Sequence, residues 1–255
     1  MVPYTYRSVI LEEAGSTNTE AFAQGAAGEA GPLWVMARRQ TQGRGRSGRT
    51  WTSDTGNLYA SLLQRLRCSQ KVVHHLSLLA GVAVVDAIVG ATGRRVPGLR
   101  LKWPNDVLIG EAKCAGILPE SQVWAAGPEV VVVVGIGINL ASHPAGLGRA
   151  VTHLAEHGVP IAPEAMLRFL AQAMDRWIGI WDCGGGFATI RTAWLDRAGA
   201  VGEPLSVDTG RERIAGTFHD LDEGGALILR DGRGAYRTLT FGDVTLAQAS
   251  DKDRG

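Results

Sequence analysis

The sequence predicts an α+β fold in which a mixed sheet is flanked by helices and followed by a small all-β barrel. Up to residue 199, apolar β-forming segments alternate with segments of helical period, and beyond it only short β-like runs broken by Gly and Asp remain. With 255 residues and 45% hydrophobic content, the chain can bury a core. We therefore expect a large domain over residues 1–199, a β-domain over residues 200–250 and a tail over residues 251–255.

Each element is predicted from its own pattern. Strands of the large domain are expected from β-forming apolar runs at residues 6–11, 34–37, 58–63, 99–109 and 130–140. Helices are expected at residues 76–89, 166–181 and 187–197, the second because its apolar side chains form one stripe. The barrel strands are expected at residues 204–207, 214–221, 226–229, 236–240 and 244–247.

Composition argues against several classes of protein. The net charge of +1 requires no DNA or membrane partner. Cys68, Cys114 and Cys183 are scattered, which fits a reducing compartment better than a disulfide framework. Residues 1–11 lack the pattern of a signal peptide, and we expect no apolar run of membrane-spanning length. These features predict a cytoplasmic protein.

The segment QTQGRGRSGRTW, residues 40–51, combines three glycines with three arginines. Glycines let backbone N–H groups approach an anion, and guanidinium groups suit phosphate geometry. The pattern matches neither a P-loop nor a dinucleotide-binding GxGxxG motif. It predicts a nucleotide phosphate site of another kind, with a basic surface loop or a nucleic-acid contact as alternatives.

The segment LKWPNDVLI, residues 101–109, places polar groups inside an apolar run. Pro104 does not suit a central strand. A half-buried Lys102 needs an anionic or carbonyl partner, which a ligand could supply, although a solvent-reaching lysine before an Asn-Asp turn is the alternative. Lys113 comes seven residues after Asp106, so a turn at residues 109–111 would place both at one end of a strand pair.

Two further segments allow either a structural or a ligand-binding role. Asn139 ends the apolar run 130–140 and would hydrogen-bond a ligand or close the strand as a turn residue. Thr17 and Glu20 have the spacing of a capping box, while a helix start can equally bind a polar ligand. The six histidines show no metal-ligand motif, so no structural metal is expected. No nucleophile motif such as GxSxG is present.

Taken in order, EEAGSTNTEA, QTQGRGRSGRTW, LKWPNDVLI, KCAGILPES and VVVGIGINL resemble the biotin protein ligase family. The resemblance extends to the C-terminal region with its GDVTL segment, which is similar to the family's SH3-like domain. It implies the class II synthetase-like fold of biotin and lipoate ligases. Because the first strand begins almost at Met1, the DNA-binding domain of some members is not expected.

The resemblance also implies roles for individual residues. Arg46 and Lys102 would be catalytic, Arg46 holding phosphates and retaining the adenylate, and Lys102 contacting the biotin carboxyl and the α-phosphate. Biotin would be bound by Ser16, Thr17, Asn18, Gln40, Gly43, Arg44, Gly45 and Gly116. The nucleotide would be bound by Arg44, Arg46, Arg49, Trp51, Asn105, Asp106, Lys113 and Asn139. We expect the glycine-arginine segment at residues 40–51, called the arginine loop below, to be mobile when empty, because its glycines and mutually repelling arginines provide few ordering contacts.

The implied substrates are biotin and ATP with Mg²⁺, and the implied acceptor is a lysine of a biotin carboxyl carrier protein. The sequence is compatible with either a monomer or a homodimer. Residues 141–152 lack Phe, Tyr and Trp, so any stacking on adenine must come from elsewhere. A lipoate or octanoyl transferase is the alternative enzyme. A catalytically silent biotin or nucleotide sensor and a nucleic-acid-binding module are the alternatives from other classes.

Overall fold

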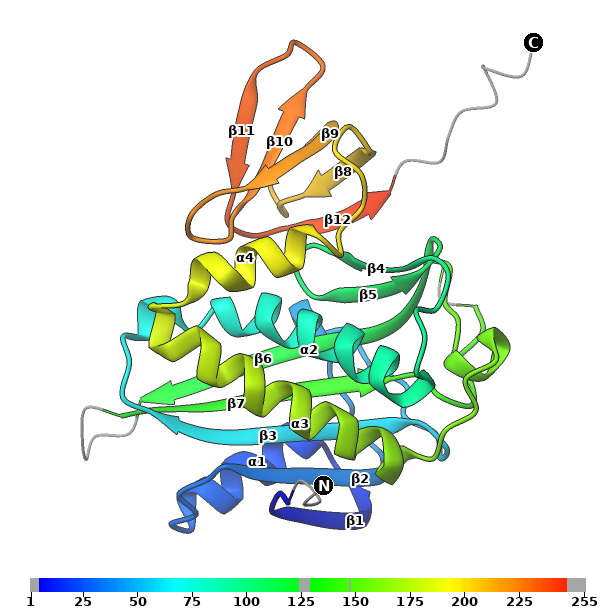
Figure 1. Ribbon diagram of the computed structural model, residues 1–255, viewed down its shortest axis with the longest axis vertical. Helices are drawn as coiled ribbons and strands as arrows, with labels where there is room; N and C mark the ends of the chain where they lie inside the picture. The colour runs from blue at the N-terminus through cyan, green and yellow to red at the C-terminus, as the bar shows by residue number, and fades with distance from the viewer. Residues whose placement is uncertain (1–4, 124–128, 147, 247–255) are drawn as a thin grey trace.

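The computed structural model describes residues 5–123, 129–146 and 148–246, and it contains two sheets (Figure 1). The larger sheet has the order β1-β2-β3-β7-β6-β5-β4, and the smaller has the order β11-β10-β9-β8-β12. Strands β1 and β2 pair in parallel, and the other neighbours pair antiparallel. The predicted mixed sheet with helices and a small β-domain is therefore confirmed.

The strands of the larger sheet are β1 (Ser8–Ala14), β2 (Leu33–Gln40), β3 (Leu58–Leu66), β4 (Leu99–Lys102), β5 (Asp106–Ile109), β6 (Ala112–Val123) and β7 (Val130–Ile138). The single strand expected at residues 99–109 is wrong, because Trp103, Pro104 and Asn105 form the turn of a hairpin between β4 and β5. Strand β6 was not among the predicted strands, although the expected turn after Ile109 is present.

Helices cover both faces of the larger sheet. On one face lie α2 (His75–Thr92) and α3 (Pro163–Trp181), with α4 (Phe187–Leu195) packed against these two helices, and on the other lies α1 (Thr17–Ala26). Each face of the sheet has its own hydrophobic cluster, and successive residues of β7 point to opposite faces. Val132 packs in the cluster with α2 and α3, whereas Val131 and Val133 pack in the cluster with α1. Burial on both faces explains why β7 is a continuous apolar run.

Helix α2 is the core helix of the domain. It is the one described helix that is long and apolar enough to cross a membrane, by length and composition only, and 67% of its 18 residues are buried inside the protein. The expectation that no run reaches this length is therefore wrong, but buried core helices share this length and composition. Its Asp86 forms ion pairs with Arg176 and Arg197, and it accepts a hydrogen bond of 2.9 Å from Trp177 Nε1. Through these contacts α2 is fastened to α3.

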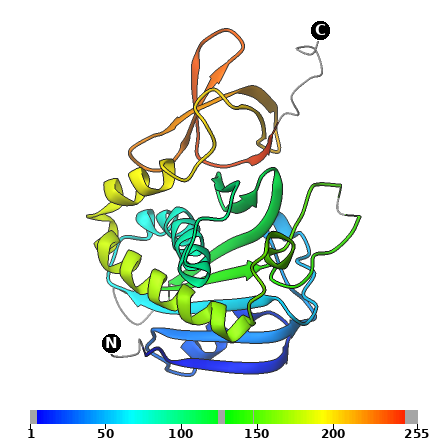
Figure 2. The same ribbon diagram turned by 45° about the vertical axis from the view of Figure 1, so that its right-hand side comes forward.

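The smaller sheet consists of β8 (Pro204–Asp208), β9 (Arg213–Leu221), β10 (Leu227–Asp231), β11 (Tyr236–Leu239) and β12 (Asp243–Leu246), so the five predicted strands are present, apart from Ala247, which lies outside the described residues. It stands above α4 and the β4–β5 hairpin in both views (Figure 2). Trp103 Nε1 donates to the carbonyl of Gly225 over 3.1 Å across this junction. We propose that the boundary between the two domains lies at residues 199 and 200, between α4 and β8; the tail 251–255 is outside the described residues.

His75 predicts a specific acid sensitivity of the fold. It is 6% exposed, its ring stacks on Phe187 at 3.6 Å, and its Nδ1 accepts from Trp181 Nε1 at 3.2 Å. Burial, and then the nearby charge of His74, lowers the pKa of His75 to about 4. Between about pH 6.5 and pH 4 the unfolded chain therefore binds a proton here that the folded chain does not. As the pH falls from about 6.5 to about 4, this group alone should therefore lower the free energy of unfolding by about 3 kcal/mol.

Denaturant unfolding at several pH values tests this expectation. His75→Gln, whose amide oxygen can still accept from Trp181, should remove this part of the pH dependence. The exposed neighbour His74 is the matched control: because burial contributes more than the charge of His74 to the shift at His75, His74→Gln should retain most of this pH dependence. Equal slopes for His75→Gln and the unchanged protein would contradict the assignment.

Candidate active site

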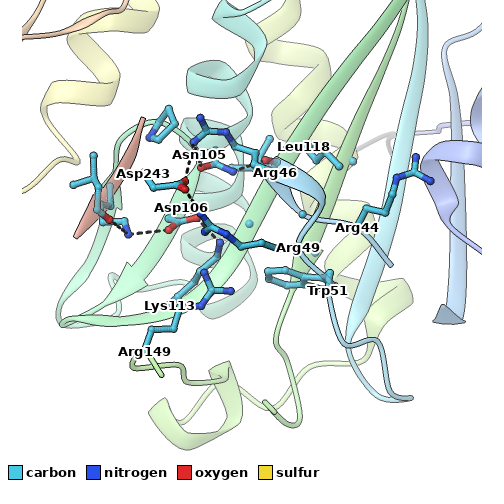
Figure 3. Close-up of a pocket in the computed structure, with 18 of the residues that line it drawn as sticks. Arg44, Arg46, Arg49, Trp51, Asn105, Asp106, Lys113, Leu118, Arg149 and Asp243 are labelled. Atoms are coloured by element: carbon cyan, nitrogen blue, oxygen red, sulfur yellow. Dashed lines mark hydrogen bonds and ion pairs between the residues drawn. The ribbon is translucent and has the colours of Figure 1, made fainter. Parts of the chain in front are cut away.

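A cavity of about 600 Å³ lies where the larger sheet meets the start of α1, the arginine loop and β12 (Figure 3). This volume is in the range of small-molecule sites. Seven cationic side chains line it against four carboxylates: Arg44, Arg46, Arg49, Lys102, Lys113, Arg149 and Arg213 against Asp106, Glu111, Asp208 and Asp243. The excess of positive charge suits an anionic ligand.

Uncharged hydrogen-bonding groups gather at the start of α1. The Oε1 atom of Gln40 accepts from the backbone N of Thr17 at 2.8 Å and from its Oγ1 at 3.1 Å. Ser61, fully buried on β3, lies 2.7 Å from Thr17 Oγ1 and 2.6 Å from Asn18 Oδ1. Ser16, Thr17, Asn18 and Gln40 line the cavity and form a preorganised polar wall, which Ser61 supports from behind.

The capping box predicted from Thr17 and Glu20 is wrong. The N-cap residue is Ser16, with extended backbone angles, and its side chain makes no capping hydrogen bond. A capping side chain must stand on the residue just outside the helix, whereas Thr17 is the first residue inside it. The Thr17 hydroxyl is hydrogen-bonded to Gln40 and Ser61 instead.

Three glycines of the central strands are required by neighbouring side chains. A Cβ atom at Gly135 would lie 2.2 Å from Asn18 Oδ1, so only glycine lets Asn18 reach the sheet. Gly116 and Gly137 are partners across β6 and β7, and a Cβ at either would lie 2.7–3.0 Å from the Trp51 ring. These two glycines form a flat bed for the indole.

Trp51 therefore lies inside the cavity as a flat aromatic surface. Its Nε1 is buried and has no hydrogen-bond partner among the described residues. Lys113 Nζ stands 5.3 Å from its ring centroid. A buried unpaired donor carries a free-energy cost, which a ligand acceptor would relieve. Trp51 is thus an aromatic side chain that lines the cavity, whereas residues 141–152 contain no Phe, Tyr or Trp.

Asp106 is the charged centre of the site. Its carboxylate is 8% exposed; Lys102 Nζ lies 3.0 Å from Oδ2, and Lys113 forms an ion pair with Oδ1. Burial alone would raise the pKa of Asp106, but the charges of Lys113 and Lys102 outweigh it and hold the pKa below its ordinary value. Lys102 also donates to the carbonyl of Val244 at 2.9 Å, so its ammonium is held in the site rather than reaching solvent.

The arginine loop is fastened to the C-terminal domain. Arg46 Nη1 donates to the carbonyl of Gly242 at 3.2 Å and lies 3.9 Å from Asp243, while Arg49 forms an ion pair with Asp243. Burial holds the pKa of Arg46 below its ordinary value. The charge of Asp106 opposes this shift, and the charge of Arg49 adds to it. The premise that repelling arginines leave this loop without ordering contacts is wrong, because one carboxylate lies between two of them. Arg44 is likewise paired, with Glu120 at 3.4 Å.

Most of the residues predicted from sequence line the cavity. The structure brings together Ser16, Thr17, Asn18, Gln40, Arg44, Gly45, Arg46, Arg49, Trp51, Lys102, Asn105, Asp106, Lys113 and Gly116. Gly43 and Asn139 are not among the lining residues. Gly43 packs under the Trp51 carbonyl, where a Cβ would lie 2.3 Å away, and Asn139 donates to the carbonyl of Thr152 at 3.0 Å. Both position other parts of the site.

Several residues of the site were not predicted. Tyr59, Arg149 and Asp243 line the cavity, and Ser61 and Glu120 hold Asn18 from behind. Burial raises the pKa of Tyr59 to about 12. The GDVTL segment that contains Asp243 was noted for its resemblance, but nothing local in it indicates that its carboxylate lies beside a loop 194 residues earlier.

Comparisons with known proteins show which proteins this chain is similar to. The model of the biotin/lipoate A/B protein ligase family matches residues 15–139. A biotin--[acetyl-CoA-carboxylase] ligase of Paracoccus denitrificans is 43% identical over 230 residues, 87% of this chain and 93% of that protein. A ligase of the same name from Mycobacterium tuberculosis is 31% identical over 246 residues, 92% of this chain and 87% of that protein.

The fold is also similar to solved structures. The biotin protein ligase of Aquifex aeolicus in complex with biotin and ATP superposes with a TM-score of 0.79 and 25% identity, covering 95% of this chain and 99% of that one. Similarity over nearly the whole length of these ligases, in both sequence and fold, leaves one conclusion. The chain belongs to the biotin protein ligase family.

Proposed function

We propose that this protein activates biotin with ATP and transfers the biotinyl group to a lysine of a biotin carboxyl carrier protein. The observation that carries the proposal is one cavity that joins an uncharged polar wall to a cationic cluster. Biotin has an uncharged ring system and a carboxylate, and ATP carries phosphates, so the two halves of the cavity match the two substrates. The cytoplasm, where ATP is available and scattered thiols stay reduced, is the proposed location.

The polar wall is the proposed site of the biotin rings. Ser16, Thr17, Asn18 and Gln40 offer donors and acceptors. Ser61 and Glu120 hold Asn18, and Thr17 and Ser53 hold Gln40. Arg44, Gly45 and Gly116 complete this side of the cavity. A preorganised polar wall loses little entropy when it binds a ligand with matching groups.

The cationic cluster is the proposed site of the phosphates. The biotin carboxylate oxygen attacks the α-phosphorus of ATP, the bond from that phosphorus to the bridging oxygen breaks, and pyrophosphate leaves. Lys102 and Arg46 offset the negative charge that grows on the phosphate oxygens. Arg49, Asn105 and Lys113 border the same region, and Trp51 offers its face to the adenine.

Transfer completes the reaction. The uncharged ε-amine of the acceptor lysine attacks the biotinyl carbonyl carbon, the bond to the phosphate oxygen breaks, and AMP leaves as the proton passes to solvent. No nucleophile of the protein is required, so the protein contributes positioning and charge stabilisation. Because both oxygens of Asp106 are paired with lysines, we propose that Mg²⁺ is held chiefly by the ATP phosphates rather than by this carboxylate.

Biotin-dependent exchange of pyrophosphate into ATP tests the adenylation step. Purified protein should exchange label with biotin and not with lipoate or octanoate. Labelling of a carrier domain in a second assay separates an enzyme from a silent binding protein. Exchange with lipoate would favour the lipoate branch of the family, and binding without exchange would favour a sensor.

The glycine bed predicts a sensitive position outside the charged cluster. In Gly137→Ala the new Cβ would lie 2.7 Å from the Trp51 ring, so the indole must move. Displacing a surface on which a substrate rests should lower kcat/KM for ATP by roughly 10- to 100-fold. Gly179→Ala on α3 is the matched control, because nothing lies within 4 Å of its Cβ, and it should leave activity unchanged. Equal activity of both variants would remove Trp51 from the proposed nucleotide site.

A further inference from the structure

Two histidines and a glutamate converge beside the cavity, outside the groups used above. His143 follows β7, and His153 precedes the short 3-10 helix Leu154–His157, which carries Glu156. The two Nδ1 atoms are 2.9 Å apart, and Glu156 Oε1 lies 3.4 Å from His153 Nδ1 and 3.8 Å from His143 Nδ1. These three ligand-type atoms all lie within 4.8 Å of one another.

The dimensions of this triangle fit a transition-metal ion. A triangle with these three sides has a point about 2.0 Å from every corner. Zinc is bound by His nitrogen at roughly 2.0–2.1 Å and by carboxylate oxygen at roughly 2.0–2.2 Å. Tetrahedral ligands at those distances stand about 3.3 Å apart, within the range of the three sides. A fourth position is left for water or another ligand.

The carboxylate is oriented by a buried hydroxyl. Thr152 Oγ1 donates to Glu156 Oε2 at 2.7 Å, which leaves Oε1 facing the histidines. Thr152 is itself 4% exposed, its backbone N donates to Lys113 O at 3.0 Å, and its carbonyl accepts from Asn139 at 3.0 Å. Metal-binding carboxylates are commonly held by such outer hydrogen bonds. Because Thr152 is itself held by backbone hydrogen bonds, its hydroxyl keeps the Glu156 carboxylate in a fixed orientation.

We propose that His143, His153 and Glu156 form a zinc site. The ion would join the two sides of the segment that brings Arg149 to the cavity, since the histidines precede and follow that arginine in the chain. Imidazole nitrogens select zinc over Mg²⁺, which prefers oxygen ligands, so this site is distinct from the Mg²⁺ that accompanies ATP. It modifies the expectation that the chain holds no structural metal, and it does not depend on the ligase reaction.

Metal titration tests the site without using activity. Tag-free protein, stripped with a chelator and kept free of ATP, is titrated with Zn²⁺ against a chromophoric chelator and with Co²⁺, whose visible spectrum reports tetrahedral coordination. We expect one equivalent to bind, with no competition from millimolar Mg²⁺. His143→Ala, His153→Ala and Glu156→Gln should each weaken Zn²⁺ binding by more than about 100-fold, because each removes a direct ligand.

Two further variants complete the experiment. Thr152→Val keeps all three ligands but loses the hydrogen bond that orients Glu156, and it should weaken Zn²⁺ binding by about 10- to 100-fold. His219, whose ring centroid lies 4.6 Å from that of Tyr236 in the C-terminal domain, provides the matched control, and His219→Ala should bind Zn²⁺ as the unchanged protein does. Circular dichroism of the metal-free variants checks folding, and Glu156→Gln is the mildest change because this glutamate is exposed.

The outcomes distinguish a zinc site from a hydrogen-bonded histidine pair. Loss of Zn²⁺ binding in the three ligand variants but not in His219→Ala supports the site. Failure of the unchanged protein to bind one equivalent, or equal binding by the ligand variants, overturns it. The histidine pair would then be a hydrogen bond in which one Nδ1–H donates to the other Nδ1.

Discussion

Replacement of Lys102 by alanine is expected to lower biotin-dependent ATP–pyrophosphate exchange by about 100- to 1,000-fold. The Lys102 ammonium is held at the cavity by Asp106 Oδ2 at 3.0 Å and by the Val244 carbonyl at 2.9 Å. A fixed cation of this kind stabilises charge that develops on phosphate oxygens without reorganising during the reaction. Removing it should affect the rate more than the affinity for biotin.

The structure also predicts that Lys102→Ala stays folded. Asp106 keeps its ion pair with Lys113, so the buried carboxylate is not left without a cation. The thermal unfolding temperature should therefore change little, and calorimetric biotin binding should persist while exchange is lost. Lys71→Ala, at an exposed lysine distant in sequence, is the matched control. Exchange within a few-fold of the unchanged protein would remove Lys102 from the proposed catalytic role.

Arg46→Ala is expected to release the adenylate before transfer. Arg46 borders the cavity through its contacts with Asn105 at 3.4 Å and the Gly242 carbonyl at 3.2 Å, so its loss opens the junction between the arginine loop and β12. A lost charge-assisted contact to phosphate of about 1.5–3 kcal/mol corresponds to roughly 10- to 100-fold weaker retention of the adenylate. Free adenylate should then label lysines of unrelated proteins.

Labelling of serum albumin, which is not a natural acceptor, measures that release. Arg46→Ala should increase albumin labelling relative to carrier labelling, whereas Arg211→Ala, at an exposed arginine of the C-terminal domain, should leave the ratio unchanged. Asp243→Asn provides a second approach to the same junction, since it removes the carboxylate between Arg46 and Arg49. A ratio that stays constant in Arg46→Ala would contradict its proposed role in retention.

The family, the fold class and most of the predicted residues that line the cavity could be found from the sequence because they depend on local patterns. Three informative patterns each lie within about ten residues: the glycine-arginine loop, the lysine before a proline turn and the continuous apolar strand. The prediction of one strand at residues 99–109 was wrong for a local reason too. The turn at residues 103–105 is so short that it does not interrupt the apolar pattern. The capping box failed because helix starts are uncertain by a residue or two.

The remaining features were decided by tertiary structure. Gly116 and Gly137 face the same indole only because β6 pairs with β7 in one register, and Ser61 reaches Asn18 only because β3 lies beside α1. Asp243 meets Arg49 across 194 residues because the C-terminal domain packs against the hairpin. Local pattern reports which side chains are buried and which backbone angles are allowed. Which distant side chains then share a cavity depends on strand order and domain packing, and these follow from the burial of the whole chain at once.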